Sequence, residues 1–308
     1  MEIAKFYLFY IPLFVVLTVV IIKHLNNKET NEERLTVLKW IAALGIVLHL
    51  IKPLFFPYNG QIDVLNGNPN IFKWPAILRK ITIENVSAAT TMFYLPVLMS
   101  KKKPLLDYMT IIGFIGGFLA IIYPAEVILQ TFDSLDVVYT KNLFSFDTVR
   151  FYVVHYIPLI ISFSLMYYRI HTLDLKRKHL FSLSVVGILA ILFVNEWIIY
   201  QVGWLDDIEI VMRDEYGITN LFYERNYRNF SFVFGIPDSF KGIGFFIDIL
   251  VPGFMKTFQG QDNYIPVIWI IGPAIIYGPL LYSAFYYASK NLNYFKVKKI
   301  DHIEEVVV

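Results

Sequence analysis

The sequence predicts an all-α, polytopic membrane protein with seven transmembrane helices. The 308 residues are 56% hydrophobic, with a mean hydropathy of +0.55. Only 17% of them are charged, whereas soluble domains carry about a quarter. Several apolar runs reach the roughly 20 residues that a helix needs to cross a bilayer. We therefore expect one transmembrane domain over residues 1–308, located in the cell membrane.

Seven apolar runs are the expected spans, at residues 6–23, 36–56, 81–99, 108–131, 149–168, 180–203 and 263–288. The first run is followed by the polar sequence "KHLNNKETNEER" and by no small-residue cleavage site. It is therefore expected to be a span and not a cleaved signal peptide.

The distribution of lysine and arginine predicts the orientation. The segments after the odd-numbered spans contain 14 basic residues, and the other short segments contain five. Cytoplasmic loops are rich in Lys and Arg, so we expect the N-terminus outside and the C-terminus inside. The 14 residues are Lys23, Lys28, Arg34, Lys101, Lys102, Lys103, Arg169, Lys176, Arg177, Lys178, Lys290, Lys296, Lys298 and Lys299.

Two long loops are expected on the outside. Residues 57–80 are rich in turn formers such as Asn-Gly and Asn-Pro. Residues 204–262 form the longest loop, in which "GIGFFIDILVPGFM" at 242–255 is too short to span. This stretch is expected to be an interfacial or re-entrant piece that covers the outer mouth.

Five of the predicted spans place polar side chains at a similar depth near their outer ends, judged by the rise of about 1.5 Å per helical residue. Such residues are costly in a bilayer and mark functional sites. Each can instead lie near the interface on its own, but their shared depth favours one polar cavity open to the outer leaflet. They are His49, Lys52, Glu84, Asn85, Ser87, Thr91, Glu126, Arg150, His155, Asn195 and Glu196.

Helical spacing supports the shared cavity. Glu84, Ser87 and Thr91 fall on one face of their span, three and four residues apart. Gly45, His49 and Lys52 are expected to form a similar face on the second span. The inner two-thirds of the predicted spans contains no acidic residue and no histidine, so it is expected to be dry.

A hydroxyl, an imidazole and a carboxylate are the parts of a nucleophile, base and orienting group. Ser87 is the candidate nucleophile and His155 the candidate base, with Glu126 or Glu196 to fix the imidazole tautomer. The remaining polar residues are candidates for substrate binding. Lipid would supply an acyl chain, which favours acyl transfer or hydrolysis, while a proton relay or cation binding also fits a histidine among carboxylates.

Other site classes have less support. The chain has no cysteine, so disulfides and thiolate metal sites are excluded. No HExxH zinc motif occurs, and no late span offers a lysine for a retinal. A haem between His49 and His155 is a minor alternative. No metal or cofactor is expected, and nothing suggests nucleic acid.

Three stretches together resemble the YwaF-like bacterial integral membrane proteins, over about residues 36–288. They are "ENVSAATTMFYLPVLMSKKK", "YMTIIGFIGGFLAIIYP" and "VRFYVVHYIPLIISFSLMYY". The matching positions are Gly116, Gly117, Pro124, Arg150 and His155. That family is related to a eukaryotic transmembrane enzyme that moves polyunsaturated acyl chains between phospholipids, so the resemblance implies phospholipid acyl transfer with His155 in the site.

This chain departs from that enzyme at one point. The enzyme uses a cysteine early in the helix that "ENVSAATT" matches, and here Ser87 stands nearest to that place, with Thr90 and Thr91 close by. Thioester chemistry is thus excluded, whereas a serine–histidine version is not.

We therefore expect an enzyme that acts on acyl chains of membrane lipids, with no protein partner indicated. A non-catalytic lipid-binding or assembly protein, or a small-solute carrier, is the alternative. The enzyme hypothesis requires His155 within hydrogen-bond reach of Ser87 or another hydroxyl.

Overall fold

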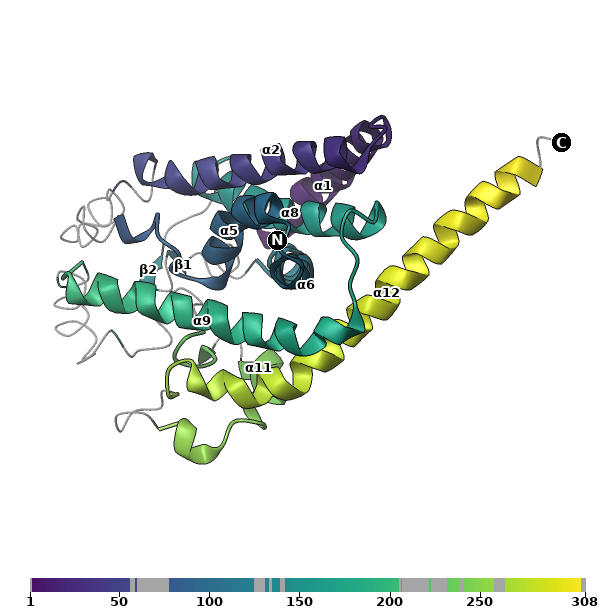
Figure 1. Ribbon diagram of the computed structural model, residues 1–308. Coiled ribbons are helices and arrows are strands. Elements are labelled where there is room, and N and C mark those ends of the chain that lie inside the picture. Colours follow the sequence, from purple (N-terminus) through teal and green to yellow (C-terminus); the bar gives the residue numbers. More distant parts are fainter. Residues whose placement is uncertain are drawn as a thin grey trace.

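The computed structural model describes residues 2–55, 59, 78–124, 131–132, 135–138, 142–204, 206, 222, 232–238, 241–257 and 264–305. Apart from one small hairpin, their regular secondary structure is helical, as the sequence predicts (Figure 1). The helices are α1 Glu2–Asn26, α2 Asn31–Leu50, α5 Val86–Ser100, α6 Lys103–Ile122, α8 Phe146–Tyr167, α9 Lys178–Gln201, α11 Lys241–Asp248 and α12 Ile271–Glu305. Short 3-10 turns are η1 Lys52–Leu54, η2 Leu175–Arg177, η6 Gly253–Met255 and η8 Ile268–Ile270. The hairpin pairs β1 Thr131–Phe132 with β2 Leu135–Val138.

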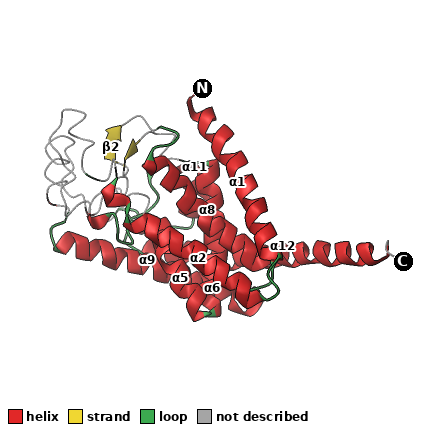
Figure 2. Cartoon of the chain, turned by 90° about the horizontal axis from the view of Figure 1, so that it is seen from above, coloured by secondary structure: helices red, strands yellow, loops and turns green. Residues whose placement is uncertain are grey.

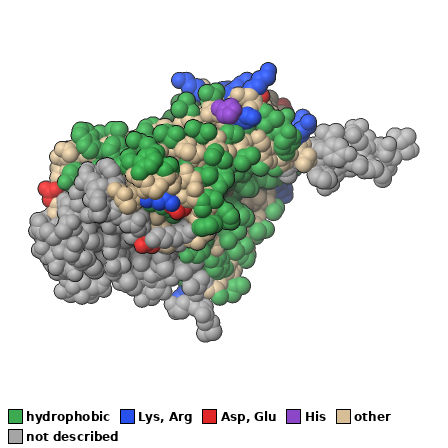
Figure 3. Space-filling model, turned by 90° about the horizontal axis from the view of Figure 1, so that it is seen from below, with side chains coloured by type: hydrophobic (Ala, Val, Ile, Leu, Met, Phe, Trp, Pro, Cys, Tyr) green, Lys and Arg blue, Asp and Glu red, His purple; other side chains and the backbone are tan. Residues whose placement is uncertain are grey.

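Five segments of the described chain are long and apolar enough to cross a membrane. They are Ala4–Asn26, Lys103–Ile122, Phe146–Tyr167, Leu175–Gln201 and Ile268–Asn291. Hydrophobic side chains also cover much of the described surface (Figure 3). The chain is therefore a helical protein suited to a membrane. The other two predicted spans correspond to α2, which begins with the charged sequence NEER, and to the 15-residue α5. The count of seven spans thus stays a prediction.

Capping residues explain where α2 and α5 begin. The Thr30 side chain accepts a hydrogen bond from the Glu33 N–H and starts α2 before the predicted residue 36. The Asn85 side chain accepts from the Ala88 N–H at 2.7 Å and starts α5 after the predicted residue 81. Glu84 therefore precedes α5, and the prediction that it shares a helical face with Ser87 is wrong.

Prolines explain the ends of α6. Pro104 stands in the first turn, where a missing N–H costs nothing, so α6 begins at Lys103 and not at the predicted residue 108. Pro124 follows the last turn, and the helix ends at Ile122 and not at residue 131. As a result Asp107 lies inside α6, which corrects the expectation that the inner parts of the spans contain no acidic residue.

A buried contact joins α5, α6 and α8, the three helices at the centre of the described chain. The Tyr94 hydroxyl of α5 donates to the Met109 carbonyl of α6 at 2.8 Å and lies 2.6 Å from the Ser162 hydroxyl of α8. Gly113 leaves the space that the Tyr94 hydroxyl occupies. The contact holds α5 and α8 at a fixed separation, on which the site described below depends.

The other helices pack around this centre. The α2 helix packs against α5 and α8, and α9 packs along α12. Tyr10 and Phe14 of α1 stack on Tyr152 and Tyr156 of α8, with ring centroids 3.9 and 4.5 Å apart. The second half of α12 extends away from the other helices (Figure 2).

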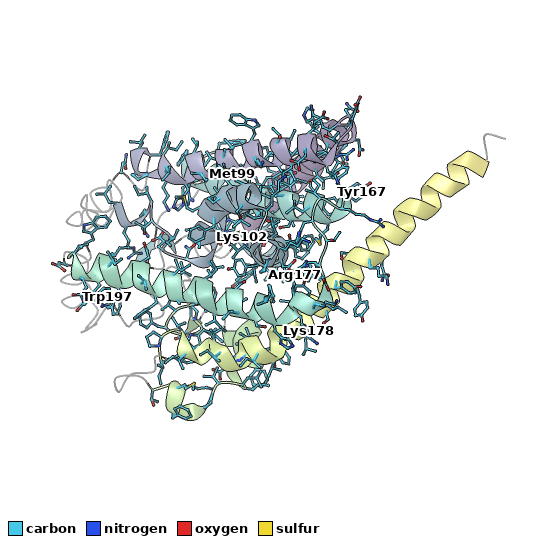
Figure 4. The ribbon with its side chains drawn as sticks, in the orientation of Figure 1. Met99, Lys102, Tyr167, Arg177, Lys178 and Trp197 are labelled. Atoms are coloured by element: carbon cyan, nitrogen blue, oxygen red, sulfur yellow. The ribbon has the colours of Figure 1, made fainter. Side chains whose placement is uncertain are left out.

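The basic segments that follow α1, α5 and α8 lie at one end of the molecule. Lys101 pairs with Glu32 at 2.5 Å, and the Tyr168 hydroxyl lies 2.8 Å from the Asn26 side-chain oxygen. At the start of α9, Arg177 belongs to the same end, whereas Trp197 lies near the other end of that helix (Figure 4). The prediction that the loops after odd-numbered spans share one side of the membrane requires this grouping. Which side of the membrane this end faces stays a prediction.

Candidate functional site

Ser87 and His155 lie side by side, although 68 residues separate them in the sequence. Ser87 is in the first turn of α5, and His155 is in the first half of α8. The Ser87 hydroxyl oxygen is 3.2 Å from Nε2 of His155. The distance lies at the upper limit of a normal hydrogen bond, and both side chains are half-buried. The structure therefore brings together the two residues that the enzyme hypothesis requires.

The second ring nitrogen of His155 fixes the tautomer. Nδ1 is 2.7 Å from the backbone carbonyl oxygen of Phe151, one helical turn earlier. A carbonyl only accepts, so Nδ1 carries the proton and Nε2 of the neutral imidazole is left to accept from the Ser87 O–H. The expected orienting group was a carboxylate, whereas a backbone carbonyl takes the position at Nδ1.

A glycine sets the backbone separation at His155. A Cβ atom on Gly117 of α6 would overlap the His155 carbonyl oxygen and touch the Leu159 side chain. Gly116 has no atom within 4 Å of the corresponding position. Only Gly117 of this pair therefore allows α6 to lie directly against α8 beside the histidine.

A buried ionic cluster surrounds Glu84, three residues before Ser87. The Glu84 carboxylate is 3.5 Å from Nζ of Lys52, 3.2 Å from Arg79 and 3.3 Å from Nζ of Lys80. All four side chains are nearly inaccessible. We call these four residues the Glu84 cluster. Burial lowers the pKa of Lys80 to about 7, although the Glu84 carboxylate favours its charged form.

Thr82 connects this cluster to two other helices. Its backbone carbonyl lies 3.1 Å from Nε2 of His49 in α2, and its hydroxyl accepts from the Asn195 amide of α9 at 3.1 Å. Thr82 was not a predicted site residue, because a single threonine near the end of a predicted span carries no signal of its own. His49, Lys52, Glu84 and Asn195 thus meet on the segment that leads into Ser87.

The remaining predicted residues have separate places. Thr91 lies on the buried side of α5, where its methyl group packs against Gly45 of α2. Arg150 is buried and pairs with Asp147 at 3.2 Å. Glu196 is buried on α9, and Glu126 lies outside the described residues.

A second buried network lies at the basic end of the molecule, and none of its residues was a predicted site residue. The Asp107 carboxylate of α6 is 2.6 Å from Nε2 of His171, 2.6 Å from Nε of Arg177 and 3.0 Å from the Tyr282 hydroxyl of α12. We call these four residues the Asp107 cluster. The Tyr282 hydroxyl also accepts from the Asp174 N–H at 2.9 Å. Asp107 stood outside the predicted span, so no pattern in the sequence marked it.

Within the described part of the chain, no group of three His, Cys, Asp or Glu residues is arranged to hold a metal ion.

Comparisons with protein-family profiles, with curated proteins and with solved structures find no match to this chain. The case for a function therefore depends on the geometry of the site.

Proposed function

We propose that the protein is an integral membrane enzyme that transfers or hydrolyses lipid acyl chains, with Ser87 as nucleophile and His155 as general base. The hydrogen bond between the Ser87 hydroxyl and Nε2 of His155 is the observation that supports it. The neutral tautomer held by the Phe151 carbonyl leaves Nε2 able to accept a proton. Membership of the YwaF-like family is part of the same proposal, because Ser87 stands near the place of the cysteine in the related enzyme.

The proposed reaction has two halves. In the first, Ser87 Oγ attacks the ester carbonyl of a lipid while Nε2 of His155 takes the serine proton. The tetrahedral intermediate then expels the lipid alcohol, which receives that proton, and Ser87 is left as an acyl ester. In the second half, water or an acceptor hydroxyl attacks this ester, His155 takes its proton, and the proton returns to Ser87 as the acyl product leaves.

The position of Ser87 at the start of α5 supports this chemistry. The first N–H groups of a helix have no acceptor within the helix. They can therefore donate hydrogen bonds to the negatively charged oxygen of a tetrahedral intermediate. The Asn85 side chain already takes the Ala88 N–H. The N–H groups of Val86 and Ser87 are therefore the proposed oxyanion donors.

Labelling with a fluorescent fluorophosphonate tests the proposal directly. The purified protein in lipid nanodiscs should become labelled, and mass spectrometry should place the probe on the peptide that contains Ser87. Ser87→Ala should abolish labelling. Ser184→Ala is the matched control, because Ser184 is a helical serine whose hydroxyl donates to the Leu180 carbonyl. An unlabelled wild type, or equal labelling of Ser87→Ala, would refute the nucleophile.

Lipid analysis of cells gives the substrate. A strain that lacks the protein is compared with strains rescued by the wild type, by Ser87→Ala and by His155→Ala. The proposal expects an altered distribution of acyl chains in the lipids of the deletion strain. It expects correction by the wild type alone, and equal rescue by His155→Ala would remove the catalytic role of the histidine.

A non-catalytic lipid-binding protein is the second candidate. One observation favours it: the group at Nδ1 of His155 is a backbone carbonyl and not a carboxylate. A neutral carbonyl stabilises the imidazolium that forms during catalysis less than a carboxylate does. This candidate expects lipids to co-purify equally with the wild type and with His155→Ala. A carrier has less support, because Asp107, His171 and Tyr282 of the Asp107 cluster are buried at the opposite end.

A further inference from the structure

Residues 241–257, which contain α11 and η6, expose an apolar surface. Phe245 is 58% exposed, Phe246 66%, Ile249 56% and Phe254 71%. From Gly242 to Phe254, every exposed residue whose side chain is described is apolar or glycine. We call Phe245, Phe246, Ile249 and Phe254 the α11 patch. A surface of this kind facing water is rare and marks a contact with a membrane or a partner.

The carboxylate of this segment has partners within the protein. Asp248 pairs with Lys256 at 2.7 Å and accepts a hydrogen bond from the Tyr264 hydroxyl. Tyr264 belongs to a small buried cluster with Ile236, Val251 and Trp269. Asp248 is therefore paired, and it is not among the exposed residues that form the α11 patch.

Contacts with α12 give the depth of the segment. The Tyr277 hydroxyl donates to the Phe246 carbonyl at 2.6 Å, and the Leu250 carbonyl lies 3.2 Å from where a Cβ atom on Gly272 would be. Tyr277 is nine residues into the candidate span Ile268–Asn291, which is about 13 Å at 1.5 Å per residue. The α11 helix thus lies beside the first part of a spanning helix (Figure 1).

The exposed face of α12 at this depth is apolar as well. Ile275 is 63% exposed, and Ile276 and Leu280 are also exposed. The α11 patch therefore continues, in depth and in chemistry, a surface that a spanning helix presents to lipid. This continuity favours acyl chains over a protein as the material that covers the patch.

We infer that α11 and η6 form a re-entrant segment, which rests against the first third of α12 and exposes the α11 patch to lipid acyl chains. The segment enters and leaves the leaflet in which α12 begins. This assignment chooses between the interfacial and re-entrant alternatives that the sequence left open. The segment lies against α12, and the hydrogen bond between Ser87 and His155 involves only α5 and α8. The inference is therefore independent of the proposed enzymatic activity.

The lack of cysteine in the chain makes a clean test possible. Two full-length variants, Phe246→Cys and Phe254→Cys, each contain a single cysteine to which one nitroxide spin label is attached. The labelled proteins are reconstituted in vesicles of phosphatidylcholine and phosphatidylglycerol. Accessibility to oxygen, which concentrates in acyl chains, is compared with accessibility to a water-soluble nickel chelate. Ile275→Cys is the control for the lipid-facing surface, and Lys102→Cys is the control for water.

The inference expects both patch labels to give the Ile275 pattern, with high oxygen and low nickel accessibility. Nickel accessibility equal to that of Lys102→Cys would overturn it and place the patch in water. Low accessibility to both reagents would also overturn it, because protein from a second copy or partner would then cover the patch. Gel filtration checks folding, and Phe245→Cys replaces any variant that aggregates.

Discussion

The backbone carbonyl oxygen of His155 lies so close to Gly117 that a Cβ atom on that glycine would overlap it. The contact is between main-chain atoms of α6 and α8, so no side chain can move to relieve a larger residue. It limits how closely the backbone of the candidate base can approach α6. The distance from His155 to Ser87 therefore depends on a residue that touches neither the serine nor the imidazole.

Gly117→Ala should lower the free energy of unfolding by about 1–3 kcal/mol, the usual cost of forcing an extra carbon into a packed site. Thermal unfolding in detergent measures this, and fluorophosphonate labelling should slow with it. Gly116→Ala is the matched control, because its added methyl group meets nothing within 4 Å. The control should be neutral or more stable by up to about 1 kcal/mol. Equal effects of the two variants would contradict the positioning role.

His155→Gln should slow labelling of Ser87 by about 10²–10⁴-fold, the usual contribution of a general base. Glutamine keeps polar atoms in place of the ring but cannot accept the serine proton, so the melting temperature should change little. His179→Gln serves as control, since His179 is exposed in α9. A labelling rate within a factor of two of the wild type would show that Ser87 needs no base.

Asp107→Ala should be among the most destabilising substitutions, with a loss of about 3–5 kcal/mol, because it leaves buried partners of a carboxylate unpaired. Tyr282→Phe removes the hydrogen bond to Asp107 and the one from the Asp174 N–H, and it should cost about 1–3 kcal/mol. Glu32→Gln, which breaks only the exposed pair with Lys101, should have the smallest effect of the three. Denaturant or thermal unfolding of the three variants gives the order, and any other order would contradict the structural importance of the Asp107 cluster.

The pH dependence of stability should carry a contribution from Lys80. Its pKa is about 7 in the folded protein, against an ordinary value of 10.5. Between these values the unfolded chain binds more protons than the folded one, so the free energy of unfolding rises with pH across this window. The melting temperature of the wild type, measured from pH 7 to pH 10, should rise relative to that of Lys80→Met. Parallel curves for the two proteins would show that Lys80 stays charged when folded.

Much of the helical architecture could be predicted from the sequence, because apolar runs of spanning length need no tertiary information. The pairing of Ser87 with His155 was also within reach, since both fall at a similar depth from the predicted helix ends. Helix boundaries were less predictable, because they depend on single capping residues and prolines. Asn85, by starting α5, moved Glu84 out of the helix and into an ionic cluster.

Two features of the site could not have come from the sequence. The orienting group at Nδ1 of His155 is a backbone carbonyl, and every residue has one, so no residue type marks it. The Asp107 cluster joins residues from three separate parts of the chain, and its carboxylate sits in a turn of α6 that the hydropathy pattern did not include. Contacts between distant segments appear only when the helices are packed.

The Asp107 cluster also has a consequence for how the protein is made. Tyr282 follows Asp107 by 175 residues, so α6 leaves the ribosome long before the last partner of its carboxylate exists. His171 and Arg177 arrive first, 64 and 70 residues after Asp107. Completion of the cluster is thus a late step of biogenesis, after α12 has been synthesised. Chains that end before Ile271 should be degraded faster in cells than full-length chains, and a pulse-chase measurement compares the two.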